Sequence, residues 1–256
     1  MFDTFGGRGS FMFGWFRSKA ECPIDPATRE WVDRRWDWLE GQFGRERLRD
    51  SIVVLPRAEF FPDPYHGEEE DVRRMLDRVC AYMDIDHATV EVSLYEERTP
   101  AYDGVWRQGT AGLYHPEDGK FRIWLEIANL DDPIGLVATM AHELGHVHLL
   151  GHGRLSEEAD DHEPLTDLLT VFFGLGVFTA NAVIHENYWH AGYVSGWNMG
   201  RRGYLGMPVY GYAFARFARA RGEDRPDWSR HLRLDVRSAF KQAMRFLAQN
   251  PPAAKS

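Results

Sequence analysis

The chain has 256 residues, of which 44% are hydrophobic and 14% aromatic; this supplies a substantial core and excludes wholesale disorder. Its 39 acidic and 30 basic residues give a formal charge of −9 at pH 7, which argues against a nucleic-acid backbone as the main partner. Two cysteines cannot form a disulfide framework, so we expect a cytoplasmic protein.

Neither the start of the chain nor its longest charge-free stretch has the pattern of a membrane segment. The apolar residues 11–16 are too short for a signal sequence and precede the basic residues instead of following them. We expect residues 1–20 to form a flexible tail and residues 250–256 a disordered one. The stretch 168–184 lies at the lower limit of a membrane span. We interpret it as a buried core helix and expect no stable membrane span.

The first half of the sequence predicts helices alternating with strands. Asp25 and Pro26 are typical of a helix start, and this helix should end near Gly44. A short buried strand is predicted at 51–56, and a helix at 68–84 with Cys80 in the core. Further strands are predicted at 89–96, 110–115 and 121–130, and the last two should form a hairpin through Asp118-Gly119.

The second half predicts helices alone. Asp132 and Pro133 begin a helix that should run to about Leu150, with Gly151 as its stop. Helical periodicity follows at roughly 163–184, 208–221 and 235–248. Together these elements predict an α+β fold: a mixed sheet with helices, then a helical half, with a cleft between them. No polar linker separates the halves, about 21–151 and 152–249, so we expect a single domain over 21–249.

The helix that begins at Asp132 carries an HExxH motif, His142-Glu143-Leu144-Gly145-His146. Residues four apart in a helix differ by about 40° around its axis, so both imidazoles project from one face. One tetrahedral metal ion can bind both. Glu143 lies beside them, where it can accept a proton from a water molecule.

Two residues compete to be the third metal ligand. Glu163 opens the next predicted helix, and Asp167, one turn later, can hold the far nitrogen of a histidine ligand. His152 falls where the pattern HExxHxxGxxH places a third histidine, but Leu149 occupies the position of its glycine. We favour Glu163, because it also accounts for the spacing of Asp167.

HExxH, 16 intervening residues and then ExxxD resemble the gluzincin (thermolysin-like) zinc metallopeptidases. The resemblance implies a zincin-like fold and a Zn²⁺ ion held by His142, His146 and Glu163, with Asp167 orienting a histidine. It also implies that the strand at 121–130 is an edge strand, which borders the cleft and binds an extended substrate.

Zincins usually recruit a donor for the transition state from downstream of the motif. Tyr204 precedes a helix start and carries a hydroxyl group, so we name it for this role; Tyr210, His185 and His190 remain alternatives. Other polar residues near the motif have simpler interpretations: His148 is a surface or core histidine. A solvated loop is expected to contain Asp160, Asp161 and His162.

These residues favour a zinc-dependent hydrolase, most simply a metallopeptidase that cleaves a peptide or protein substrate with Glu143 as general base. Two alternatives stay open: a metal-binding sensor or regulatory module with a zincin-like site and little turnover, and a zinc hydrolase of a non-peptide substrate. The sequence specifies neither the cleavage specificity nor the oligomeric state.

Overall fold

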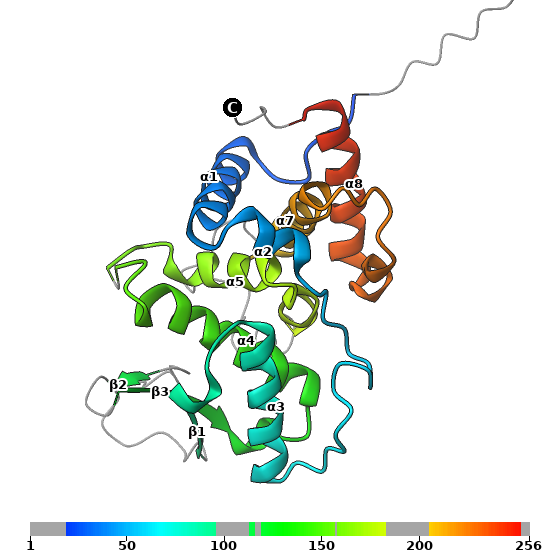
Figure 1. Ribbon diagram of the computed structural model, residues 1–256. Helices are drawn as coiled ribbons and strands as arrows, with labels where there is room; N and C mark the ends of the chain where they lie inside the picture. Colours follow the sequence, from blue (N-terminus) through cyan, green and yellow to red (C-terminus); the bar gives the residue numbers. More distant parts are fainter. Residues whose placement is uncertain (1–18, 96–112, 116–118, 157, 183–204, 252–256) are drawn as a thin grey trace, which may run out of the picture.

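The computed structural model describes residues 19–95, 113–115, 119–156, 158–182 and 205–251. It has a helix-rich α+β architecture with one small sheet (Figure 1). The helices are α1 (Pro26–Phe43), α2 (Arg45–Asp50), α3 (Glu69–Tyr82), α4 (Pro133–His146), α5 (His162–Phe172), α7 (Met207–Ala220) and α8 (Leu234–Gln249). Residues 176–182 are also helical, and a π-helical turn, Val147–Gly151, continues α4.

The sheet is mixed, as the sequence predicts, but the strand that was expected at its edge lies in its centre. Strand β3 (Lys120–Glu126) lies in the centre, parallel to β1 (Val90–Tyr95) and antiparallel to β2 (Leu113–His115). The prediction of an edge strand at 121–130 is therefore wrong within the described sheet. The strand is also shorter than predicted, because a 3₁₀ turn at Ile127–Asn129 ends it and leaves Ile127 exposed.

Helices α4 and α5 run side by side through the middle of the molecule (Figure 1). Helix α3 and the sheet lie on one side of this pair, and α1, α7 and α8 lie on the other. Helix α1 therefore joins the C-terminal helices instead of the sheet. The Ala20 N–H donates to Oε1 of Gln249 at 2.9 Å, so the helical layer is built from both ends of the described chain.

The predicted strand at 51–56 is an extended segment without strand pairing. Val54 and Leu55 are buried, but Ile52 is 61% exposed. The Val54 N–H donates to the Gly174 carbonyl at 3.0 Å, at the turn after α5. This segment therefore covers the end of α5. Its apolar residues are buried there, which explains why its sequence has the composition of a buried strand.

The single helix predicted at 163–184 is interrupted. Helix α5 ends at Phe172, Gly174 takes a φ of +86°, and a helix resumes at 176. A Cβ atom on Gly174 would lie 2.2 Å from the Ile52 carbonyl oxygen, so both the left-handed backbone and the close contact require glycine. The interpretation of this stretch as core is confirmed, since its described side chains are almost all buried. No described helix is long and apolar enough to cross a membrane.

Gly145, inside the HExxH motif, sets the distance between α4 and α5. A Cβ atom there would lie 2.7 Å from Cγ2 of Thr166 and 3.5 Å from its carbonyl oxygen. Both helices are buried at this point, so neither neighbour has free space in which to move. The absence of a side chain at position 145 therefore allows the second helix to approach the motif.

We expect Gly145→Ala to lower the free energy of unfolding by about 1–3 kcal/mol, because an added methyl group must separate α4 from α5. Gly41→Ala is the matched control, since Gly41 is also helical and has nothing within 4 Å of the added atom. The control should be neutral or slightly stabilising. Urea denaturation of both variants in a chelator measures the difference; equal stabilities would contradict the packing argument.

Candidate metal centre

The two motif histidines lie on the last turns of α4. The helix begins cleanly, with Pro133 as its first residue and the Asp132 carboxylate accepting from the Gly135 N–H at 3.0 Å. This start fixes the helical register that places His142 and His146 one turn apart. Their ring centroids are 4.8 Å apart and nearly perpendicular. His142 is only 7% exposed, so the pair faces the interior.

Helix α5 brings Glu163 to the same point from the other side. Nε2 of His142 lies 3.1 Å from Oε2 of Glu163 and 3.2 Å from Nε2 of His146. Nε2 of His146 lies 3.4 Å from the same Glu163 oxygen. Two ligands of a tetrahedral zinc ion with bonds of ~2.0–2.1 Å lie about 3.3–3.4 Å apart. The three atoms therefore have the spacing of three ligands of one such ion.

Hydrogen bonds to the far nitrogens of the two rings fix their tautomers. Nδ1 of His142 is 2.9 Å from Oδ1 of Asp167, and a carboxylate only accepts, so Nδ1 carries the proton. Nδ1 of His146 is 3.3 Å from Oγ1 of Thr166, whose own proton goes to the His162 carbonyl at 2.8 Å. The predicted contact between Asp167 and a motif histidine is thus present, and the histidine is His142.

With both Nδ1 atoms protonated, three lone pairs converge: those of two Nε2 atoms and of Oε2 of Glu163. In a site that is largely shielded from solvent, such an arrangement favours a cation among the three atoms. In a metal-free chain the cation is a proton on His142, whose pKa burial alone would lower but the Asp167 and Glu163 carboxylates hold well above its usual value. A metal ion fits the same position and would release that proton.

The charges of the other two ligand groups agree with this arrangement. Although burial disfavours the Glu163 carboxylate, its contacts with the His142 and His146 rings hold its pKa far below the usual value. Burial lowers the pKa of His146, so this ring stays neutral. A carboxylate and a neutral imidazole are the forms that bind metals.

Glu143 is placed beside the ligands. It is 4% exposed, and one of its carboxylate oxygens lies within 4.8 Å of one ring nitrogen each of His142 and His146. A water molecule on an ion at this site would therefore be within reach of the Glu143 carboxylate. This buried His142–Glu143–His146 group could hold a metal ion.

The other predicted candidates lie elsewhere. His152 follows the π-helical turn, where its Nδ1 accepts from Arg154 at 2.9 Å, and it belongs to neither metal-binding group of the described residues. His148 is a core residue: it stacks on Phe173, its Nε2 donates to the Met83 carbonyl at 2.6 Å, and burial lowers its pKa to about 4.

Of the four candidate donors, only Tyr210 is described. It is fully buried in α7. Tyr204, His185 and His190 lie outside the described residues. The first described residue after Tyr204 is Leu205, whose N–H donates to Oδ2 of Asp167 at 2.9 Å. The chain that follows Tyr204 therefore reaches the carboxylate that orients His142.

The sequence did not predict the hydrogen bonds by which Trp31 and Arg35 hold Asp161, the residue before His162; we call this set of contacts the Asp161 clamp. Asp161 was expected in a solvated loop, but its carboxylate accepts from Nε of Arg35 and from Nε1 of Trp31, both at 2.7 Å. Both donors lie in α1, so this N-terminal helix holds the start of α5. The sequence does show that Trp31 and Arg35 lie one helical turn apart on α1, but no local pattern indicates that their partner is Asp161.

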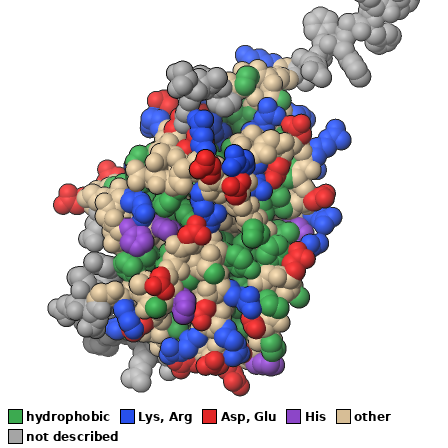
Figure 2. All heavy atoms as spheres, in the orientation of Figure 1, with side chains coloured by type: hydrophobic (Ala, Val, Ile, Leu, Met, Phe, Trp, Pro, Cys, Tyr) green, Lys and Arg blue, Asp and Glu red, His purple; other side chains and the backbone are tan. Residues whose placement is uncertain are grey.

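His162 was assigned to the same loop, yet it is the first residue of α5 and lies beside the ligands. Atoms of His146, His162 and Glu163 form a second group with mutual distances within 4.8 Å. Figure 2 shows histidine side chains gathered on the surface where α4 and α5 meet.

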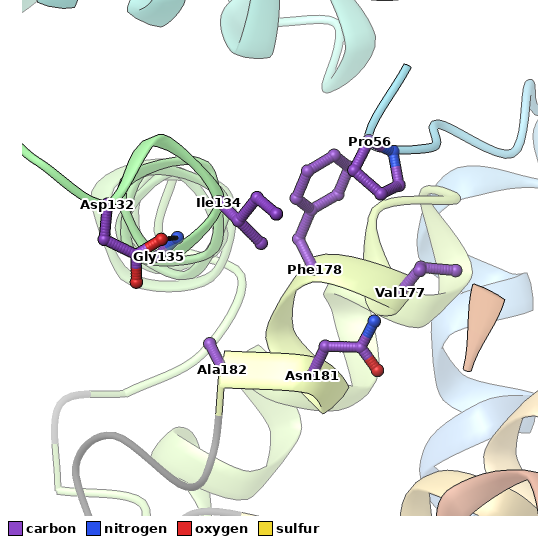
Figure 3. A pocket seen from close by; sticks show the side chains of 8 residues that line it. All are labelled: Pro56, Asp132, Ile134, Gly135, Val177, Phe178, Asn181 and Ala182. Carbon is purple, nitrogen blue, oxygen red and sulfur yellow. Dashed lines mark hydrogen bonds between the residues drawn. The ribbon is translucent and has the colours of Figure 1, made fainter. Parts of the chain in front are cut away.

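A cavity of about 250 Å³ lies at the opposite end of α4, between its start and the helical residues 176–182 (Figure 3). At ~1.5 Å per residue, His142 is about 13 Å further along the helix than Pro133. This cavity lies between residues of the two predicted halves, but it is separate from the predicted metal ligands. Its lining consists of Pro56, Asp132, Ile134, Gly135, Val177, Phe178, Asn181 and Ala182.

The chain matches no protein-family model, no curated protein and no solved structure. The candidate metal centre is therefore defined by its own geometry: two imidazole nitrogens and a carboxylate oxygen in a triangle, with a second carboxylate beside them.

We expect Glu163→Ala to weaken Zn²⁺ binding sharply, because it removes one corner of the ligand triangle. Asp167→Ala should cost about 10–100-fold, since it releases the His142 ring. His152→Ala should leave the affinity nearly unchanged. Competitive Zn²⁺ titrations with a chromophoric chelator give the three values. Loss of binding in His152→Ala with retention in Glu163→Ala would reverse the ligand assignment.

The Asp161 clamp leads to a second prediction, which concerns Arg35. Arg35→Gln should lower Zn²⁺ affinity about tenfold, because it loosens the backbone just before Glu163. Arg34→Gln is the matched control, since Arg34 lies next to it on α1 and pairs with Glu30 in solvent. Zn²⁺ titration below the unfolding temperature, with helicity checked by circular dichroism, compares the two. Equal affinities would show that the clamp does not position the ligand.

Proposed function

We propose that this chain is a zinc-dependent hydrolase of gluzincin type, most simply a metallopeptidase. One observation carries the proposal: three lone pairs, two imidazole and one carboxylate, converge in a buried triangle that a zinc ion fits, and the Glu143 carboxylate lies beside them. A structural site does not need this additional carboxylate, whereas a hydrolytic site needs a base.

The surroundings of the triangle support a zincin-like fold. The HExxH helix packs against the central strand of a mixed sheet, and a second helix supplies the third ligand. The described sheet has two edge strands, β1 and β2, and only β2 is antiparallel to the central strand. We therefore assign to β2 the substrate-binding role that was expected for 121–130. A peptide that pairs with such an edge is held extended along it.

The mechanism follows from the residues present. A zinc ion held by His142, His146 and Glu163 would supply a Lewis acid that polarises a scissile carbonyl and makes water nucleophilic near neutral pH. Asp167 and Thr166 keep both imidazoles in the tautomer that leaves Nε2 free. Glu143 accepts the proton of the attacking water and passes it to the leaving amine. We assign the stabilisation of the transition state to Tyr204.

Zinc content is the first test. Protein purified without added metal should contain close to one Zn²⁺ per chain, removable by a chelator, because the ligand set leaves a position open for water. Elemental analysis before and after chelation measures it. A chain that lacks zinc and does not take it up on titration would contradict the proposal.

Glu143→Gln tests the catalytic role. The variant keeps the shape of the side chain but removes the base, so it should retain zinc and stability while losing peptide hydrolysis by at least about 100-fold. A fluorogenic peptide library on both proteins provides the rates. Equal rates would exclude Glu143 as the base. Full zinc occupancy without hydrolysis of any peptide would favour the sensor or a non-peptide substrate.

A further inference from the structure

The two groups of potential metal ligands overlap. His146 and Glu163 belong both to the triangle with His142 and to the group with His162. Nδ1 of His162 lies 3.6 Å from Oε1 of Glu163, and its ring centroid is 5.8 Å from that of His146. Two ligands of one tetrahedral ion lie about 3.3–3.4 Å apart. The 3.6 Å contact of His162 is with Oε1, whereas the triangle uses Oε2 of Glu163, so the His162 ring must rotate to become a fourth ligand.

The hydrogen bonding of His162 leaves this nitrogen available. Nδ1 is shielded from solvent yet has no hydrogen-bond partner among the described residues. Buried ring nitrogens normally have one. The two motif histidines differ in this respect, because Asp167 and Thr166 each occupy an Nδ1 atom. Nδ1 of His162 is therefore a potential metal-ligand atom that makes no hydrogen bond among the described residues and lies beside the candidate metal site.

The backbone around His162 permits neighbouring residues to bind one ion. His142 and Glu143 lie inside a helix, where consecutive side chains diverge by about 100°. His162 is also followed directly by a helical residue, but it is the first residue of α5, and Asp161 before it has non-helical angles, φ −114° and ψ 20°, so no preceding helical turn restricts its rotamer. The His162 carbonyl is fixed by Thr166, but the side chain is about one-third exposed. Its imidazole can therefore rotate toward the ion or away from it.

We propose that His162 is a fourth, displaceable ligand of the metal held by His142, His146 and Glu163. With His162 bound, the site has four protein ligands and no position for water, as in structural zinc sites. With His162 rotated away, one position opens and the site is competent for hydrolysis. This inference rests on the proposed function. It adds an inactive state of the site, in which His162 occupies the position that water needs.

Co²⁺ provides a spectroscopic test, because its visible absorption reports the number and type of ligands. His162→Ala replaces an imidazole with water, so the Co²⁺ spectrum should change and Zn²⁺ affinity should fall about tenfold or more. Azide, a small anion that takes an open position, should bind the Co²⁺ form of His162→Ala about tenfold more tightly than the wild type, where it competes with His162.

His152→Ala is the matched control, since it removes a nearby imidazole that is outside both ligand groups. Its Co²⁺ spectrum and azide affinity should equal those of the wild type. If His162→Ala also equals the wild type in both, the fourth ligand is excluded while the zinc site stands. If the wild type binds neither Co²⁺ nor Zn²⁺, the proposed function fails, and this inference with it.

Discussion

The contact between Gly145 and Thr166 is the constraint on which the candidate metal centre depends. Because position 145 has no side chain, the methyl group of Thr166 can occupy the space above α4. The hydroxyl group of the same threonine binds Nδ1 of His146 and the His162 carbonyl. One residue therefore sets the separation of the two helices and the tautomer of a ligand. The short distances from Glu163 to His142 and to His146 follow from that separation.

The parts of the site that follow from helix geometry could be predicted from the sequence. Four-residue spacing places His142 beside His146, and the same spacing carries Asp167 to the face of α5 that holds Glu163. The helix starts could also be predicted. The Asp132 side chain accepts a hydrogen bond from a free N–H group of the first turn, and the proline that follows has no N–H group. Such features need only neighbours within one or two turns, so a single sequence contains the information.

The features that were missed depend on contacts between distant segments. The strand order puts β3 in the centre because β1 and β2 both pair with it, and no local pattern in 121–130 distinguishes a central strand from an edge. The extended segment at 51–56 has the apolar composition of a strand, but its partner is the turn at Gly174. Asp161 was expected in solvent, yet Arg35 of α1 holds it from 126 residues away.

The N–H of Leu205 donates to Asp167 from 38 residues further along the chain. During synthesis, the HExxH helix and α5 therefore emerge before the group that completes the hydrogen bonds of Asp167. Until then, one oxygen of this buried carboxylate lacks that donor, and the orientation of His142 is less firmly held. Helix α1 precedes α4 and α5 in the chain, but it packs against α7, which follows them. The residues of the candidate site are thus synthesised before the segments that hold them in place, so its geometry is completed only after Leu205 and α7 have joined the fold.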